Sequence, residues 1–142
     1  PYRSKRTLDL LWRGIGLYID HHQIDVMFGC ASFPGVDAAR HTHALSFLKH
    51  CAASAVDWSV EALTSCRADV TLIDRDALDI RRALAELPPL VKGYLRCGAR
   101  FGDGAVVDRQ FNTSDVFVVM PVKDIDPRIL GRFSAPAAQA AA

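Results

Sequence analysis

Apolar residues recur at helical spacing in the first part of the chain. Between residues 7 and 20 these positions are Leu8, Leu11, Trp12, Ile15, Tyr18 and Ile19. The spacing predicts a helix with one buried stripe, which Ser4 or Thr7 would cap. Gly14 and Gly16 each lower helix stability by about 1 kcal/mol relative to alanine, so we expect another part of the molecule to pack closely there.

The later segments predict a mixture of helices and strands. Helical patterns cover residues 37–53, 76–87, 88–97 and 126–133. Asp76 lies near the start of the second of these, and Pro88-Pro89 suits the first turn of the third. Strand patterns cover residues 24–30, 99–108 and 114–122, and residues 54–75 predict a loop with a short strand near 70–73. The order predicts a mixed α/β domain over residues 1–133, followed by a disordered tail over 134–142.

Composition narrows the class of protein. With 142 residues and a net charge of +1, the chain is one domain or part of one, and it lacks the basic balance of a nucleic-acid-binding protein. Four widely spaced cysteines without a C-x-x-C pair argue against a zinc site or a disulfide scaffold and favour a reduced, cytoplasmic protein. No apolar run approaches the roughly 20 residues of a membrane span. The chain opens at Pro1 without a methionine, which we interpret as a fragment.

The start of the first helix is a candidate anion site. Arg3, Lys5 and Arg6 crowd into four positions at the point where the helix begins. A helix N-terminus exposes unpaired N–H groups and suits a phosphate group. A solvated basic chain end explains the same residues, and the pattern alone does not separate the two interpretations.

Other polar residues indicate a catalytic or ligand-binding role more weakly. Asp103, Asp108 and Asp115 could supply two carboxylates for acid–base catalysis if the strands bring them together, although solvated or capping aspartates are commoner. GARFGDG lacks the Gly-Lys-Ser/Thr ending of a phosphate-binding loop, so we expect a helix stop followed by a turn or bulge. The five histidines form no H-E-x-x-H pattern, and no metal site is expected, although one of them could act as a general base.

The segment PPLVKGYLRCG places two cations on one helix face. Lys92 and Arg96 are four residues apart, and Arg81, Arg82 and Arg100 would extend them into a basic rim. Such a rim could dock an acidic protein or an anionic membrane surface. An ordinary amphipathic helix with its cations in water is the interpretation that the pattern alone favours.

Three stretches of the sequence resemble those of a known protein family. The resemblance is carried by YRSKRTLDLLWRGIGLYI, by IDVMFGCASFPGVD and by LPPLVKGYLRCGARFGDGAVVDRQFNTSDVFVVMPV. These stretches look like the bacterial ornithine N-acyltransferases, which resemble the GNAT acyltransferase superfamily and are often labelled hemolysin-like. The resemblance runs from Tyr2 to about Phe133 and is most specific from Leu87 to Pro121.

The resemblance implies a reaction and a donor site. Such an enzyme would transfer a 3-hydroxy fatty acyl group from acyl carrier protein to the α-amino group of ornithine, the first step of ornithine-lipid synthesis. The residues from Arg3 to Thr7 (Arg3, Ser4, Lys5, Arg6 and Thr7) would then bind the phosphate of phosphopantetheine. The strand from Ile24 to Cys30 would admit the thioester arm, with Ser32 as a contact, and no permanently bound cofactor is implied.

The chain also departs from the superfamily pattern. Ser4, Lys5 and Arg6 stand where that superfamily has a glycine-rich loop, which argues against acetyl-CoA and favours an acidic carrier protein. The resemblance further implies a GNAT-like mixed sheet without the N-terminal half of the fold, so we expect residues 1–142 alone to be inactive. A GNAT-type enzyme with a different amine acceptor, and a non-catalytic basic-faced domain that docks on an acidic partner or a membrane, stay open as alternatives.

Overall fold

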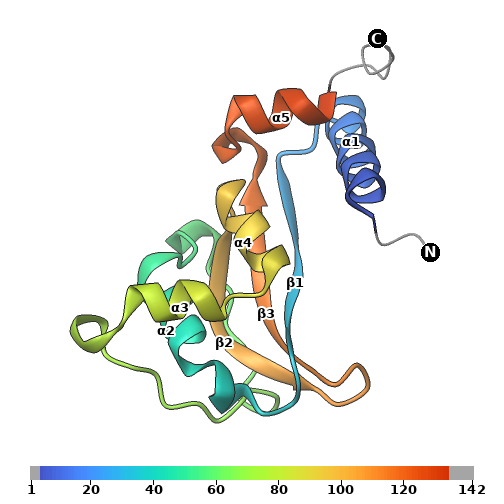
Figure 1. Ribbon diagram of the computed structural model, residues 1–142. Coiled ribbons are helices and arrows are strands. Elements are labelled where there is room, and N and C mark those ends of the chain that lie inside the picture. Colours follow the sequence, from blue (N-terminus) through green and yellow to red (C-terminus); the bar gives the residue numbers. More distant parts are fainter. Residues whose placement is uncertain (1–3, 135–142) are drawn as a thin grey trace. The chain divides into compact units, whose positions relative to one another are not determined.

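The computed structural model describes residues 4–134 of the chain (Figure 1). Its helices and strands, in chain order, are α1 (Lys5–His22), β1 (Val26–Pro34), α2 (Thr42–Cys51), α3 (Ile80–Glu86), α4 (Pro89–Arg96), β2 (Arg100–Asp108), β3 (Thr113–Pro121) and α5 (Pro127–Ser134). Helices flank a three-stranded sheet, which confirms the expected mixed α/β class. Within residues 4–134, no helix has both the length and the apolar character needed to cross a membrane.

The chain divides into two compact units. One consists of Phe28–Met120, and the other joins the segment up to Met27 with the segment from Pro121 onward. In this second unit, α1 packs against α5. Ser4 caps α1 as expected, because its side chain accepts a hydrogen bond from the Thr7 backbone N–H at 3.2 Å.

The buried stripe expected along α1 is largely absent. Ile19 is buried and Trp12 is half-buried, but Leu11 and Tyr18 are 61% and 59% exposed. The spacing predicted the helix correctly, yet periodicity cannot tell which face another element will cover. Of the two glycines where close packing was expected, Gly16 is buried, whereas an alanine methyl group at Gly14 would meet none of the described residues within 4 Å.

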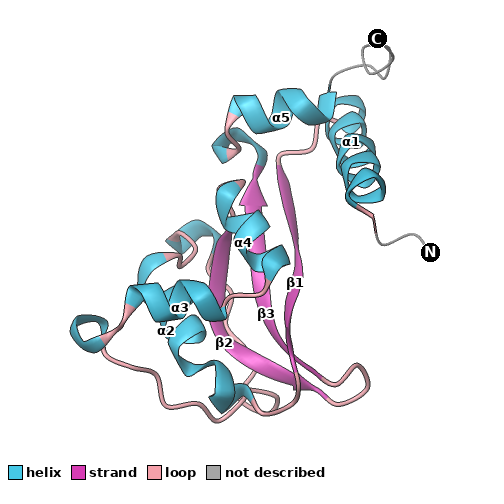
Figure 2. Cartoon of the chain, in the orientation of Figure 1, coloured by secondary structure: helices cyan, strands magenta, loops and turns pink. Residues whose placement is uncertain are grey.

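The sheet of the unit Phe28–Met120 places β3 in the middle, in the order β1-β3-β2 (Figure 2). β2 and β3 are antiparallel, with Val106 opposite Asp115 and Asp108 opposite Thr113. Their register shifts between Phe101 and Ala105, where the sequence predicted a turn or bulge at the glycines.

The irregular segment after α2 covers the outer edge of β2. Its backbone N–H groups at Ser54, Ala62 and Ala68 donate to carbonyl oxygens of the strand at 2.7 to 2.8 Å. The close approach explains the glycine at position 102, because a Cβ there would lie 2.5 Å from the Val60 carbonyl oxygen.

The core of this unit lies between the sheet and the helices that cover it. α2 packs on α3 and on β2. Phe33 and Phe101 are the largest fully buried side chains, and Ala44 and Ala83 let the helices approach closely. Truncating either phenylalanine to alanine would cost about 3 to 5 kcal/mol of stability.

Several elements differ from those expected, and β1 runs on to Pro34 instead of ending at residue 30. The segment expected to be helical from residue 37 begins as a 3₁₀ turn over Ala38–His41, before α2. α3 begins at Ile80 rather than near Asp76, because the Asp79 carboxylate accepts from the Arg82 backbone N–H and caps the helix. The short strand expected near residues 70–73 does not form.

Candidate functional site

One face of the sheet carries the two carboxylates that the sequence proposed for catalysis. Side chains alternate along β3, so Thr113, Asp115 and Phe117 share one face while Ser114 and Val116 point to the buried face. Asp108 lies opposite Thr113 and therefore shares the face of Asp115. The two carboxylates are diagonal neighbours across the β2–β3 pair.

Asp108 has a role in the hairpin turn. Its Oδ1 accepts a hydrogen bond of 2.9 Å from the Phe111 backbone N–H. Asn112 closes the turn with a φ of +55° in the left-handed region, which asparagine tolerates better than most residues. One oxygen of this carboxylate is thus engaged in shaping the loop.

Asp115 and Thr113 differ from Asp108 in that each has a buried side-chain oxygen without such a hydrogen bond in the described part of the chain. Asp115 Oδ1 and Thr113 Oγ1 are both shielded from solvent, and among residues 4–134 neither has a hydrogen-bond partner. On the opposite face, the fully buried Ser114 donates from Oγ to the Gly35 carbonyl oxygen at 2.8 Å. The strand therefore satisfies its buried hydroxyl on one face and leaves two buried oxygens unbonded on the other.

Ser32 belongs to the same face. The Gly35 N–H donates to the Asn112 carbonyl at 2.9 Å, and the Val122 N–H donates to the Asp25 carbonyl at 2.8 Å. Both bonds fit one antiparallel register of β1 on β3, and in that register Ser32 lies opposite Asp115. Ser32 is exposed, which is compatible with the contact expected for it.

Aromatic side chains border this group. Phe28 of β1 and Phe117 of β3 stack with ring centroids 6.1 Å apart, and Phe28 is 74% exposed. Val106 lies opposite Asp115 on the other side. The polar residues on the open face thus have apolar neighbours on both adjoining strands.

A second charged group lies on the buried side of the sheet. Asp103 contacts Lys49 at 2.6 Å and Arg67 at 3.1 Å; the Arg67 contact is an ion pair outside hydrogen-bond geometry. Burial raises the pKa of Asp103, but Lys49 and Arg67 lower it by more, so this pKa lies below its usual range. The three charged side chains line part of a small cavity of about 50 Å³, and Leu45 and Val116 are among its apolar lining residues.

The beginning of α1 lies in the other unit. Ser4 Oγ is 2.9 Å from Thr7 Oγ1, and Arg6 is exposed. Arg3 lies outside the described residues, as does the side chain of Lys5. The structure thus places Ser4, Arg6 and Thr7 at one helix end, as the sequence indicated.

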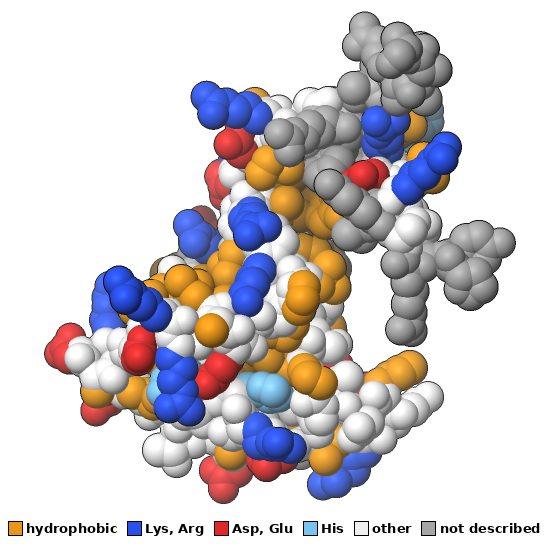
Figure 3. Space-filling model, in the orientation of Figure 1, with side chains coloured by type: hydrophobic (Ala, Val, Ile, Leu, Met, Phe, Trp, Pro, Cys, Tyr) orange, Lys and Arg blue, Asp and Glu red, His pale blue; other side chains and the backbone are white. Residues whose placement is uncertain are grey.

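The two cations proposed for partner binding lie on α4. Arg96 is exposed. Lys92 instead donates from Nζ to the Ala85 carbonyl oxygen at 3.2 Å and so caps a carbonyl group in the last turn of α3. Lys and Arg side chains are visible over α3 and α4 in Figure 3, interspersed with apolar groups. Arg96 is the more accessible of the two.

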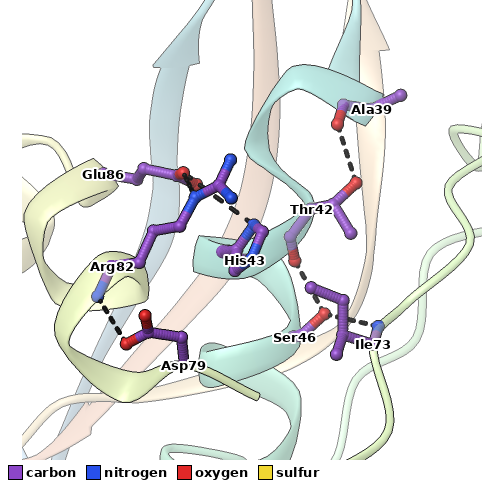
Figure 4. A network of polar contacts seen from close by, with 8 residues as sticks. All are labelled: Ala39, Thr42, His43, Ser46, Ile73, Asp79, Arg82 and Glu86. Atoms are coloured by element: carbon purple, nitrogen blue, oxygen red, sulfur yellow. Dashed lines mark hydrogen bonds and ion pairs between the residues drawn. The ribbon is translucent and has the colours of Figure 1, made fainter. Parts of the chain in front are cut away.

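The histidines near α2 serve the fold. His43 Nδ1 lies 3.9 Å from Glu86 Oε1, and Glu86 also accepts from Arg82 Nε at 2.9 Å (Figure 4). His50 Nε2 is 2.9 Å from the Ile73 carbonyl oxygen. In the part of the chain that the structure describes, no three His, Cys, Asp or Glu side chains gather in a way that could hold a metal ion.

Three residues escaped the sequence interpretation: Thr113 on the open face, and Lys49 and Arg67 in the charged group on the buried side of the sheet. Thr113 was not singled out, although strict alternation from Asp115 places it on the same face. Lys49 and Arg67 were not connected with Asp103, because those contacts join segments far apart in the chain.

Comparison with known proteins gives the family context. The chain is 48% identical to the L-ornithine N(alpha)-acyltransferase of Brucella abortus over 96% of its own length, which spans 48% of that relative. It is also 48% identical to the proteins of that name from Agrobacterium fabrum and Rhizobium meliloti, of which it spans 46% and 48%. No family model matches, and no solved structure matches. The chain spans about half the length of the curated relatives it matches, and over nearly all of its own length it is similar to L-ornithine N(alpha)-acyltransferases, which confirms the resemblance expected from the sequence.

Proposed function

We propose that the chain is part of an N-acyltransferase that transfers a 3-hydroxy fatty acyl group from acyl carrier protein to the α-amino group of ornithine. The product would be the first intermediate of ornithine-lipid synthesis. The observation that carries this proposal is the 48% identity, over 96% of the chain, to a relative named L-ornithine N(alpha)-acyltransferase.

The chemistry requires one deprotonation and one acyl transfer. The α-ammonium of ornithine loses a proton, and its nitrogen then attacks the thioester carbon. The C–N bond forms, the C–S bond breaks, and the carrier thiolate takes up a proton. Asp108 and Asp115, on one face of the sheet, are the carboxylates of this chain that we propose for contact with the two amino groups of ornithine.

The start of α1 is the proposed phosphate site for the phosphopantetheine arm. The first N–H groups of a helix lack intrahelical partners and carry partial positive charge. Ser4 accepts from the Thr7 N–H and also bonds the Thr7 hydroxyl, and Arg6 is exposed beside it. Arg3 and Lys5 would add charge at the same end, and Ser32 would contact the thioester arm.

The exposed face of α4 is the proposed docking surface for the carrier protein. Carrier proteins of this kind are acidic, and Arg96 together with Lys92 offers the complementary charge. A lipid product further implies peripheral contact of the enzyme with a membrane surface, to which the same cations would be attracted.

The test is thiol release from 3-hydroxyacyl carrier protein by the full-length protein, with and without ornithine. We expect release that depends on ornithine and yields one acyl-ornithine per thiol. Release with lysine, glutamine or homoserine-type acceptors but not with ornithine would favour a GNAT-type enzyme for another amine. Carrier binding without release under any condition would leave only a docking domain.

A further inference from the structure

The unbonded oxygens on β3 could accept hydrogen bonds from a donor outside the described residues. Asp115 Oδ1 and Thr113 Oγ1 are buried and, within residues 4–134, accept nothing. A buried polar group without a partner costs about 1 to 3 kcal/mol, and a charged one costs more. Ser114, between them in the strand, donates to the Gly35 carbonyl oxygen on the other face, so the two unbonded oxygens of this strand share one face.

The chemistry of the two groups limits what can bind them. An ionised carboxylate only accepts hydrogen bonds, and it pairs best with a cation. A guanidinium would match both oxygens of one carboxylate in a planar fork. Here one buried carboxylate oxygen of Asp115 is accompanied by two hydroxyl groups, that of Thr113 on the same strand and that of Ser32 on the neighbouring strand. Three separate acceptors suit the three N–H donors of an ammonium group.

The neighbours of this group suit an alkyl chain. Val106 lies opposite Asp115, and Phe117, stacked on Phe28, lies two positions further along β3. Apolar side chains on both adjoining strands can pack against methylene groups while the oxygens hold the charged end. The site thus favours an alkylammonium over a bare metal ion.

We infer that Asp115, Thr113 and Ser32 form the binding site for the δ-ammonium of the ornithine acceptor and so determine its selection. The inference rests on the proposed function, because it takes ornithine as the acceptor. The reacting α-amine must lose its proton, whereas an ammonium with three acceptors keeps its charge, so this group of residues suits the amine that does not react. Asp108, the other carboxylate of the face, is left for the α-amine.

The test compares ornithine with norvaline, which has the same carbon chain but no δ-amine. In the full-length protein, kcat/KM is measured for both acceptors with 3-hydroxyacyl carrier protein, in wild type, Thr113→Val, Ser32→Ala and Asp115→Asn. We expect wild type to prefer ornithine. We expect Thr113→Val and Asp115→Asn to lower that preference by about tenfold or more, because kcat/KM falls for ornithine and stays unchanged for norvaline. Thr71→Val and Asp69→Asn, at exposed positions of the same unit, are the matched controls.

Binding without turnover gives a second readout. Calorimetric titration of the full-length protein with ornithine and with norvaline, in the absence of donor, should show tighter binding of ornithine that Thr113→Val weakens. The inference would be overturned if Thr113→Val and Asp115→Asn kept the wild-type preference for ornithine, or if they lowered kcat/KM equally for ornithine and norvaline. Either result would leave the acyltransferase proposal intact. Absence of thiol release in wild type would instead refute the proposed function, and the titration would still decide whether these residues bind an ammonium.

Discussion

Lys49 Nζ lies 2.6 Å from Asp103 Oδ2, and this ion pair joins α2 to the bulge of β2. Arg67, from the segment that covers the edge of β2, approaches the other oxygen of the same carboxylate at 3.1 Å. One aspartate therefore connects three parts of the unit Phe28–Met120, and its ionisation should be visible in the stability of the protein.

The first prediction concerns the pH dependence of that stability. The pKa of Asp103 is lower in the folded protein than in the unfolded chain, where it is about 3.9, so the unfolded state takes up the proton first as the pH falls. The stabilisation is complete well above pH 4 and is lost as the pH falls through the folded-state pKa. Asp103→Asn should therefore lower the free energy of unfolding by about 1 to 3 kcal/mol at pH 7 and by less as the pH falls below 4, measured by urea denaturation. An equal effect in both pH ranges, or the same effect from the control Asp69→Asn, would contradict this.

The second prediction concerns two glycines. An alanine at position 102 would bring its Cβ to 2.5 Å from the Val60 carbonyl oxygen and 3.1 Å from the Phe117 Cβ, so the covering segment would have to move. Gly102→Ala should lower the melting temperature markedly. Gly93→Ala, inside α4 with nothing within 4 Å, should raise stability by about 0.5 to 1 kcal/mol. Similar melting temperatures for both variants would show that the covering segment does not approach β2 this closely.

The third prediction separates capping from phosphate binding at Ser4. Aspartate and asparagine cap a helix about as well as serine, so Ser4→Asp and Ser4→Asn should retain the stability of α1, while Ser4→Ala should lose about 0.5 to 2 kcal/mol. Only the aspartate places a negative charge where the donor phosphate is proposed to bind. The KM for acyl carrier protein should rise in Ser4→Asp and stay near the wild-type value in Ser4→Asn. Equal KM values for the two variants would contradict phosphate binding at the start of α1.

The fourth prediction concerns the proposed docking surface on α4. Arg96→Gln should weaken carrier-protein binding at low salt and flatten its salt dependence, since exposed charges act through a screened field. Arg128→Gln removes an exposed cation from another helix and serves as the control. Titrations at two or more salt concentrations would measure this, and parallel salt curves for wild type and Arg96→Gln would argue against docking at α4.

The fifth prediction concerns thiol reactivity. Cys97 is buried, and burial raises the pKa of its thiol, whereas Cys30, Cys51 and Cys66 are exposed. At pH 7.5 an alkylating reagent should modify the three exposed cysteines first and Cys97 only on unfolding. Peptide mass spectrometry of a time course would reveal the order, and early modification of Cys97 would mean that the end of α4 opens readily.

The sequence predicted most elements correctly where local chemistry decides them. Gly98 ends α4 with a φ of +91°, Pro89 opens that helix, and alternation marks β3. The start of α3 could not be placed, because Asp76 and Asp79 are both acceptable caps and only the fold chooses Asp79. The expected strand near residues 70–73 fails because a side chain binds its backbone: the Ile73 N–H donates to Ser46 Oγ.

The same limit applies to the candidate site. Alternation placed Asp115 and its neighbours on one face, but no local pattern reveals that Thr113 Oγ1 and Asp115 Oδ1 are buried without partners among the described residues. Likewise, the contact of Asp103 with Lys49 depends on how β2 packs beneath α2. Such properties arise from tertiary packing, which a single sequence does not display.

The irregular segment that borders β2 has a consequence for solubility. Strand edges with free N–H and C=O groups can recruit strands from other molecules, and here single bridges at Ala53, Glu61 and Arg67 engage that edge without forming a strand. A deletion within residues 54–68 would uncover this edge and should promote aggregation through intermolecular β-pairing.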